Sequence, residues 1–206
     1  KNSKKFLMKG KNDDSDIETA KIVIVGESMV GKTSMAMCYF EQTNDFKDVQ
    51  ETICAGYFKK KVMLENGEIE LVAWDTAGAE RYRALTPIYF INASVAIIVY
   101  SIDNPQSFEA LDSFHQLIME KSPDVLIYVV GNKIDLENQR KISFYQGKNY
   151  ADRIHAEDFC EVSALTGENI DCLFTQIAAN PKLKKINLQE TEANKDIRKK
   201  EHKNCC

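Results

Sequence analysis

The chain has 206 residues, of which 44% are hydrophobic and 28% are charged, and it carries a formal net charge of −4. This composition is typical of one well-packed globular domain, and the acidic balance argues against a general nucleic-acid-binding protein. No apolar run approaches the roughly 18 residues of a membrane-spanning helix. The polar N-terminus does not resemble a signal peptide, so we expect a cytosolic protein.

The pattern of apolar and polar residues predicts alternating strands and helices along the chain. Strands are predicted at 21–26, 56–64, 68–75, 94–101, 124–131 and about 158–162, and helices at 31–42, 104–121, about 142–155 and about 168–179. Asn66-Gly67 between the second and third strands is a strong β-hairpin signal. We therefore expect an α/β fold with a six-stranded, mostly parallel sheet, one antiparallel edge strand and helices on both faces.

Residues 26–33 read GESMVGKT, directly after a predicted strand and at the start of a predicted helix. Gly26 and Gly31 allow tight turns, so that backbone N–H groups can converge on phosphate oxygens. Lys32 places a cation at the β- and γ-phosphates, and the Thr33 hydroxyl can ligate Mg²⁺. The strand–loop–helix context disfavours the alternative of an ordinary glycine-containing turn. The motif predicts a nucleoside triphosphate but does not specify its base.

Residues 132–135 read NKID and follow the strand predicted at 124–131. The Asp135 carboxylate can accept two N–H donors from a guanine edge, whereas adenine presents the wrong pattern. We expect Asn132 and Lys133 to brace the nucleotide loop. Ser163 and Ala164, at the end of the next predicted strand, can close over the base with backbone groups. This tetrad is a weak signal alone and a strong one in this order after a phosphate loop.

With these motifs and WDTAGAERYRALTPIYF at 74–90, the chain resembles a Ras-superfamily small GTPase, specifically a Rab. Residues 51–58, ETICAGYF, resemble the switch I segment of Rabs, and 74–90 resemble switch II. The spacing and sequence of both segments are most similar to those of the early-endosomal Rab branch. The resemblance implies a P-loop NTPase fold with a GTP-binding (G) domain at 20–180. A flexible arm at 1–19 and a disordered basic tail at 181–206 are expected on either side.

The resemblance implies a switch set by GTP and GDP, with Mg²⁺ as cofactor. Thr52 and the Gly78 N–H would hold the γ-phosphate, and hydrolysis would release both switch segments. Metal-holding positions are Thr33, Thr52 and, through water, Asp75. The catalytic positions are Lys32, Thr52, Gly78 and Ala79. The nucleotide-binding positions are Ser28, Met29, Val30, Gly31, Lys32, Thr33, Ser34, Phe46, Thr52, Gly78, Asn132, Lys133, Asp135, Ser163, Ala164 and Leu165.

Ala79 stands where the family has a Gln that orients the attacking water. A methyl group forms no hydrogen bond, so we expect slow intrinsic GTP hydrolysis and a bias toward the GTP-bound form. Two interpretations stay open: Ala79 is natural, or it was introduced to lock the active state. The alternative function, in either case, is a GTP-locked scaffold that does not hydrolyse GTP and recruits effectors. An activating protein that brings its own Gln and Arg can still stimulate hydrolysis, because an arginine finger contributes about 10³–10⁵ in rate.

Three further departures from the family pattern bear on the site. Cys54 replaces a Gly of switch I, which would stiffen that loop, and Leu165 replaces a Lys, which removes a polar contact to the base. The number of residues between Lys32 and Thr52 is not quite that of the family. The assignment of Phe46 as the aromatic residue over the guanine depends on this spacing. His115, His155 and His202 lie outside every motif, and we expect none of them to be catalytic.

By the same resemblance, effectors read a surface formed by Ile53 and by the aromatic triad Tyr57, Trp74 and Tyr89. For Trp74, simple core packing is an equally good interpretation. The other expected partners are an exchange factor, a GTPase-activating protein and a GDP dissociation inhibitor or escort protein. We expect a monomer that binds guanine nucleotides and no nucleic acid. The Asp-x-x-Gly at 75–78 and the Asn-Lys-x-Asp at 132–135 argue against a nucleotide kinase.

The last 25 residues, 182–206, hold eight basic and four acidic residues, a net charge of +4 that leaves −8 for the rest of the chain. The chain ends in KNCC, which matches the double-Cys ending of Rabs and implies geranylgeranyl groups on Cys205 and Cys206. The alternatives are a redox pair or a chance ending. Two lipid chains give stable attachment to a membrane where one does not. We expect the cytoplasmic face of an endosomal membrane, with cycling to the cytosol, and buried reduced thiols for most of the other cysteines.

Overall fold

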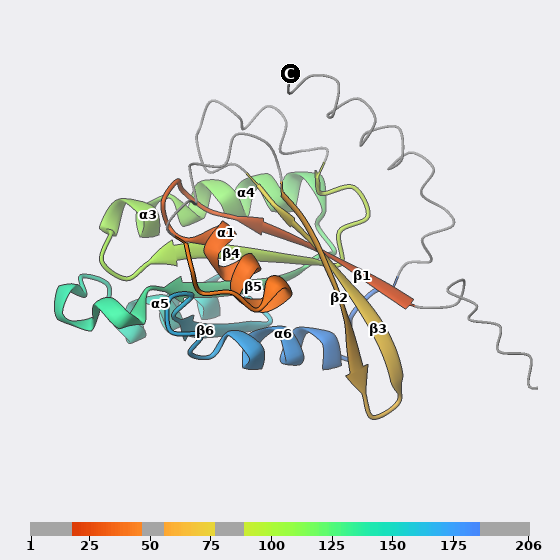
Figure 1. Ribbon diagram of the computed structural model, residues 1–206. Coiled ribbons are helices and arrows are strands. Elements are labelled where there is room, and N and C mark those ends of the chain that lie inside the picture. Colours follow the sequence, from red (N-terminus) through yellow and green to blue (C-terminus); the bar gives the residue numbers. More distant parts are fainter. Residues whose placement is uncertain (1–17, 47–55, 77–88, 186–206) are drawn as a thin grey trace, which may run out of the picture.

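The computed structural model describes residues 18–46, 56–76 and 89–185, and within them six strands form one sheet (Figure 1). The strands are β1 (Glu18–Val25), β2 (Gly56–Leu64), β3 (Gly67–Asp75), β4 (Val95–Ser101), β5 (Leu126–Asn132) and β6 (Asp158–Val162). They lie in the order β2-β3-β1-β4-β5-β6. β2 pairs antiparallel with β3 and the other pairs are parallel. The predicted sheet is thus confirmed, including its antiparallel edge strand.

The hairpin between β2 and β3 turns where the Asn-Gly signal predicts it. Leu64 pairs with Gly67, so Glu65 and Asn66 form a two-residue loop. Gly67 has a φ of 139°, a value that residues with a Cβ rarely adopt. The hairpin places the end of β3, with Trp74 and Asp75, beside the end of β1.

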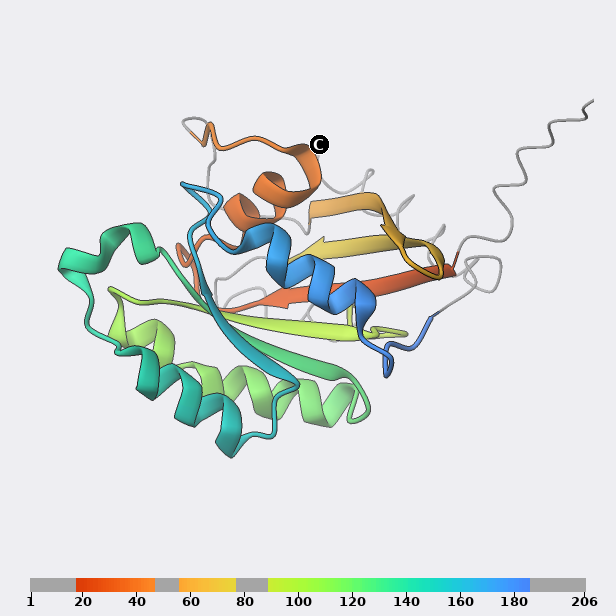
Figure 2. The same cartoon turned by 90° about the horizontal axis from the view of Figure 1, so that it is seen from below.

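Helices cover both faces of the sheet, as predicted (Figure 2). On one face lie α1 (Lys32–Ala36), which continues into the π-helical turn η1 (Met37–Glu41), and α6 (Ile170–Ala179). On the other face lie α4 (Leu111–Lys121) and α5 (Phe144–Arg153), with the short α3 (Pro105–Glu109) before α4. Each face has its own buried apolar cluster against the sheet. A 3₁₀ segment, η3 (Ile134–Gln139), follows β5.

The single helix predicted at 104–121 is wrong, because the chain forms α3 and α4 with a break at Ala110. The carbonyl of Ala110 accepts from the backbone N–H and the hydroxyl of Ser113, at 3.1 and 2.7 Å, and from the N–H of Phe114 at 3.4 Å. Short-range bonds from Ser compete with the regular helical ladder and bend it. The apolar periodicity runs through the break, which explains why the sequence pattern did not reveal it.

The packed part of the chain extends past residue 180, the predicted end of the domain. Leu183 is buried in the apolar cluster beside α6, and the Ser94 hydroxyl donates to the carbonyl of Lys184. Lys184 also pairs with Asp124 at 3.2 Å. Across the three described ranges, no helix has the length and hydropathy to cross a lipid bilayer.

The predicted cysteine environments are only partly correct. Cys38, Cys160 and Cys172 are free thiols, as expected. Cys38 and Cys160 are half-buried and Cys172 is exposed, so full burial was wrong for these three. Cys54 lies outside the described residues.

A candidate guanine-nucleotide site

The loop between β1 and α1 has the backbone that a phosphate-binding loop requires. Gly26 and Gly31 have φ values of 147° and 91°. A Cβ on Gly26 would lie 2.2 Å from the carbonyl oxygen of Val99, and a Cβ on Gly31 would lie 2.4 Å from Nδ2 of Asn132. Both positions therefore exclude a side chain through backbone conformation and through space. The glycines let the loop pack tightly against β4 and β5.

Lys32 begins α1 and directs its ammonium group back over this loop. Its Nζ donates to the carbonyl oxygens of Gly26 at 3.0 Å and Glu27 at 2.8 Å. The residue is only 5% exposed, so a cation is held inside the loop by backbone dipoles. A buried cation beside a glycine-rich turn at the start of a helix attracts anionic phosphate oxygens.

The other predicted residues of the loop lie around it in different environments. Val30 is buried in the core, Ser28 is half-buried, and Ser34 is half-buried in the first turn of α1. Met29 is 76% exposed with a φ of 65°, so its side chain stands out from the loop. Val30 thus anchors the loop in the core while Ser28 and Met29 lie at its surface.

Thr33 and Asp75 bring two oxygen ligands together beside the loop. The Thr33 hydroxyl donates to Oδ2 of Asp75 at 2.6 Å. Asp75 ends β3 and is fully buried, and its backbone pairs with Ile24 near the end of β1. A hydroxyl and a carboxylate at one point suit Mg²⁺, which prefers hard oxygen donors and phosphate co-ligands. These residues fit the predicted metal, with Asp75 contributing directly or through water.

Asn132, the last residue of β5, joins the phosphate loop to the loop after β6. Its Nδ2 donates to the carbonyl of Val30 at 2.8 Å, and its Oδ1 accepts from the N–H of Ala164 at 3.1 Å. The residue is 1% exposed, so both contacts are protected from water. This is the bracing role that the sequence predicted for Asn132.

Asp135 and Ser163 meet at the rim of the same site. The Ser163 hydroxyl donates to Oδ1 of Asp135 at 2.6 Å and accepts from the N–H of Thr166 at 3.1 Å. Lys133 reverses the chain before Asp135 with a φ of 70°. Asp135 itself is exposed, which leaves its carboxylate accessible to a base. Leu165, next to the buried Ala164, is 58% exposed and can cover an apolar ring.

Arg140 is a site residue that the sequence reasoning missed. Its guanidinium donates to both carboxylate oxygens of Glu137 and of Glu161, at 2.7 to 2.9 Å. The hydrogen bonds to Glu161, and then those to Glu137, raise the pKa of Arg140 above its already high value. The fork ties η3, which contains Ile134 and Asp135 of NKID, to β6, which precedes Ser163. Glu137 at i−3 was a readable signal, but nothing in the sequence pointed to Glu161.

The predicted aromatic triad is in contact, although it is unevenly exposed. The ring centroids of Trp74 and Tyr57 lie 5.4 Å apart, and those of Trp74 and Tyr89 lie 5.6 Å apart. Tyr57 is 36% exposed, whereas Trp74 and Tyr89 are 5% and 9% exposed. Trp74 therefore packs in the core and touches the exposed Tyr57 at the same time.

Several predicted site residues cannot be placed. Thr52, Ile53, Gly78, Ala79, Cys205 and Cys206 lie outside the described residues. Phe46 lies inside them and is half-buried against the α6-side core cluster.

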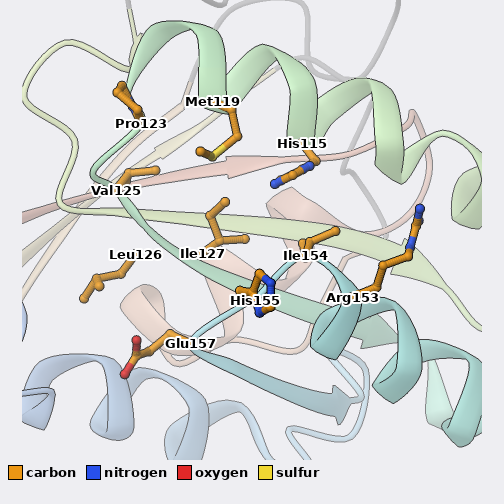
Figure 3. Close-up of a pocket in the computed structure, with 10 residues that line it drawn as sticks. All are labelled: His115, Met119, Pro123, Val125, Leu126, Ile127, Arg153, Ile154, His155 and Glu157. Atoms are coloured by element: carbon orange, nitrogen blue, oxygen red, sulfur yellow. The ribbon is translucent and has the colours of Figure 1, made fainter.

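A hollow of about 390 Å³ lies elsewhere, between α4, β5 and the end of α5 (Figure 3). His115 and His155 line it together with apolar residues such as Ile127 and Ile154. Burial lowers the pKa of His115, against the raising effect of Asp112. The start of β5, at Leu126 and Ile127, lines the hollow. Asn132 is at the opposite end of β5, and Asp135 lies just beyond that end. The hollow is therefore separate from the candidate nucleotide site.

The candidate site collects at the carboxyl ends of β1, β3, β5 and β6, where open α/β sheets bind their ligands. Fold and loop together define a P-loop nucleotide-binding protein. A model of the Ras family matches residues 21–182, and the chain belongs to this family of small GTPases. Membership in the family implies binding of GTP and GDP with Mg²⁺.

Two relatives make the resemblance more specific. The chain is 37% identical over 169 residues to Ras-related protein Rab-5A of Dictyostelium discoideum, an alignment that covers 81% of this chain and 83% of the relative. It is also 37% identical over 158 residues to putative ras-related protein Rab-5B of the same organism, covering 76% and 72%. The predicted resemblance to a Ras-superfamily small GTPase of the Rab family, nearest to the early-endosomal branch, is confirmed.

Proposed function

We propose that this chain is a Rab-type GTP/GDP switch that regulates endocytic vesicle trafficking and hydrolyses GTP slowly by itself. The proposal rests mainly on three groups of side chains that lie together at one edge of the sheet. These are the buried Lys32 cation, the Thr33–Asp75 oxygen pair and the Asn132 link to the base loop. The Rab-5 relatives support the endocytic assignment.

In this proposal the protein supplies positioning and charge rather than an acid–base pair. Lys32 neutralises charge on the phosphates, and Asp135 selects guanine by accepting two N–H bonds. Thr33, and Asp75 through water, would hold Mg²⁺, and the ion would neutralise further phosphate charge. Thr52 and the Gly78 N–H sense the γ-phosphate, which makes the surrounding segments respond to hydrolysis.

Slow hydrolysis follows from Ala79, which offers no hydrogen bond to the attacking water. Single-turnover GTP hydrolysis of the chain and of Ala79→Gln is the direct test. We expect the Gln variant to be faster, with the same GTP affinity, because the change adds a water-orienting group without altering the phosphate loop. Equal rates in the two proteins would refute this part of the proposal.

Ala79 also favours a second candidate function, a scaffold that remains GTP-bound and recruits effectors. The nucleotide that accompanies the purified protein separates the two functions. Mostly GDP indicates an enzyme that completes its cycle, whereas mostly GTP indicates the scaffold. Adding an activating protein that supplies its own Gln and Arg is a second way to separate them. It would convert bound GTP to GDP on the cycling enzyme and leave GTP bound to the scaffold.

We also propose that the double-Cys end anchors the domain to the cytoplasmic face of endosomal membranes through two geranylgeranyl groups. An exchange factor, an activating protein, a GDP dissociation inhibitor or escort protein, and effectors are the proposed partners. Replacing Cys205 and Cys206 by Ser should leave guanine-nucleotide binding intact and release the protein into the cytosol. Membrane binding that persists in the double variant would contradict the lipid anchor.

A further inference from the structure

Lys21 is a buried lysine that the nucleotide site does not use. It lies in the middle of β1 and is 3% exposed. Burying an ammonium group is costly unless it finds partners. A hydrophobic side chain at this position would pack without that cost, so the charge calls for an explanation from its contacts.

The first contact of Lys21 holds the segment that carries Tyr89. Its Nζ donates to the carbonyl oxygen of Ile91 at 2.7 Å. Its backbone holds the same stretch of chain, because the N–H of Ser94 donates to the Lys21 carbonyl at 2.8 Å. Residues 89–94 are therefore fixed to β1 by main-chain and side-chain bonds of one residue.

The second contact of Lys21 reaches the aromatic triad directly. Its Nζ lies 5.3 Å from the centroid of the Trp74 ring, within the range of a cation–π interaction. Trp74 in turn contacts Tyr57 on β2 and Tyr89. One ammonium group thus connects β1, β3 and the segment that contains Tyr89.

We propose that Lys21 is a positioning residue for partner recognition, whose ammonium group fixes Trp74 and Tyr89 so that the triad presents a defined aromatic surface. The inference rests on the proposed function, in which protein partners read this surface. The partner is expected to insert apolar or aromatic side chains around Tyr57, the exposed member. Lys21 itself touches no partner and acts only through Trp74 and Ile91.

The test uses Trp74 as a built-in probe, because it is the one tryptophan of the sequence. Trp74 emission and its quenching by acrylamide are measured on GDP-loaded full-length protein for Lys21→Met and Lys21→Arg. Lys59→Met is the matched control, since Lys59 is on β2, the strand beside the Trp74 strand β3, and its side chain is 62% exposed. We expect a red shift and stronger quenching for Lys21→Met, partial rescue for Lys21→Arg, and wild-type behaviour for Lys59→Met.

A pH titration tests the charge itself on folded wild-type protein, so the test survives a variant that fails to fold. Burial lowers the pKa of Lys21 to about 8. No carboxylate among the described residues pairs with it. The ionisable groups of the elements beside Lys21 are Glu18 on β1, Glu68, Glu70 and Asp75 on β3, Tyr100 on β4, and Tyr89. Tyr57, Lys59, Lys60 and Lys61 lie one strand further away on β2, and Lys184, whose carbonyl accepts from Ser94, pairs with Asp124. Lys59 pairs with Glu70. Trp74 emission should change near pH 8 in wild type and Lys59→Met.

The outcomes separate this inference from the proposed function. Binding of a fluorescent mant-GDP is measured on the same samples and should be unchanged by Lys21→Met. If no variant, including wild type, binds mant-GDP, the proposed function fails. If all bind it but Lys21→Met matches wild type in emission and quenching, or wild type shows no emission change near pH 8, the role of Lys21 is overturned.

Discussion

Gly31 illustrates how much one residue contributes to the candidate site. It holds a φ of 91° and leaves no room for a Cβ beside the Asn132 amide. The same Asn132 amide bonds to the Val30 carbonyl, so a change at Gly31 would disturb the phosphate loop and its link to the base loop together. We therefore expect stability and nucleotide binding to be coupled at this position.

We predict that Gly31→Ala lowers both stability and guanine-nucleotide affinity. Left-handed backbone costs a residue with a Cβ about 1–2 kcal/mol, and the 2.4 Å contact with Nδ2 of Asn132 adds to it. Gly67→Ala is the matched control, because Gly67 also has a positive φ but has no atom within 4 Å of its Cβ position. Denaturation and mant-GDP titration should show both variants destabilised and only Gly31→Ala impaired in binding. Equal binding losses would contradict the geometric argument.

A second prediction at the residue scale concerns how Lys21 makes the free energy of unfolding depend on pH. Its pKa falls from an ordinary value of 10.5 to about 8 on folding. Below pH 8 both states are protonated, so the full cost of the buried charge is present. Above pH 8 the folded state loses its proton first, and the cost is relieved toward pH 10.5. A lowering of the pKa of this size corresponds to about 3 kcal/mol.

The free energy of unfolding of the wild type should therefore rise relative to that of Lys21→Met between pH 8 and pH 10. Urea denaturation at a series of pH values, followed by Trp74 fluorescence, measures the difference between the two proteins. Subtracting the free energy of unfolding of Lys21→Met from that of the wild type cancels the contributions of groups that titrate in both proteins. Parallel curves across this window would show that Lys21 is not a buried ammonium group at neutral pH.

At the scale of elements, the two loops that we propose to bind the base are held in place by a residue outside the motifs. Arg140 connects η3, which contains the last two residues of NKID, to β6, which precedes Ser163, through Glu137 and Glu161. The side chains of Arg140 and Glu161 are only 19% and 10% exposed, so the pair is largely shielded from water. The two loops are therefore expected to move as one unit.

We predict that Arg140→Met destabilises the fold and weakens nucleotide binding. Removing one partner of a buried pair costs about 3–5 kcal/mol, and this partly exposed pair should lose about 2 kcal/mol. Arg153→Met is the control, because the Arg153–Asp112 pair is more than half exposed and contributes at most about 1 kcal/mol. Thermal melts and mant-GDP dissociation rates are the measurements. If Arg140→Met released mant-GDP no faster than Arg153→Met, the two base loops would not depend on this fork.

The elements also show what the sequence could and could not predict. Strand positions, the hairpin and the phosphate loop were readable, because apolar periodicity and glycine placement are local signals. The break at Ala110 was not, since the Ser113 hydroxyl bond to its carbonyl does not alter the apolar pattern. Glu161 as a partner of Arg140 was not readable either, because 21 residues separate them in the chain.

At the scale of the whole molecule, the parallel strand order places the site. Asp75, Asn132 and Ser163 are far apart in sequence, yet each lies at or just beyond the end of a strand. Because β1, β3, β5 and β6 all end at one edge of the sheet, their loops meet there. A mostly parallel sheet, as predicted, was therefore enough to bring Asp75, Asn132 and Ser163 to one edge. Burial of Leu183 depends on long-range packing that the polar tail sequence did not reveal.

The most direct test of the guanine-nucleotide site is the base preference of Asp135→Asn. The Asn keeps an oxygen for the Ser163 hydroxyl but replaces the second acceptor by a donor, which matches the extra carbonyl of xanthine. Asp152→Asn, an exposed carboxylate on α5, is the control.

Binding of mant-GDP and of mant-labelled xanthosine diphosphate is measured for both variants and for the wild type. Losing a hydrogen bond to a charged group costs about 1.5–3 kcal/mol. We predict that Asp135→Asn loses at least about tenfold in GDP affinity and gains xanthosine diphosphate binding, with Asp152→Asn unchanged. An Asp135→Asn protein that still prefers GDP as the wild type does would contradict the account.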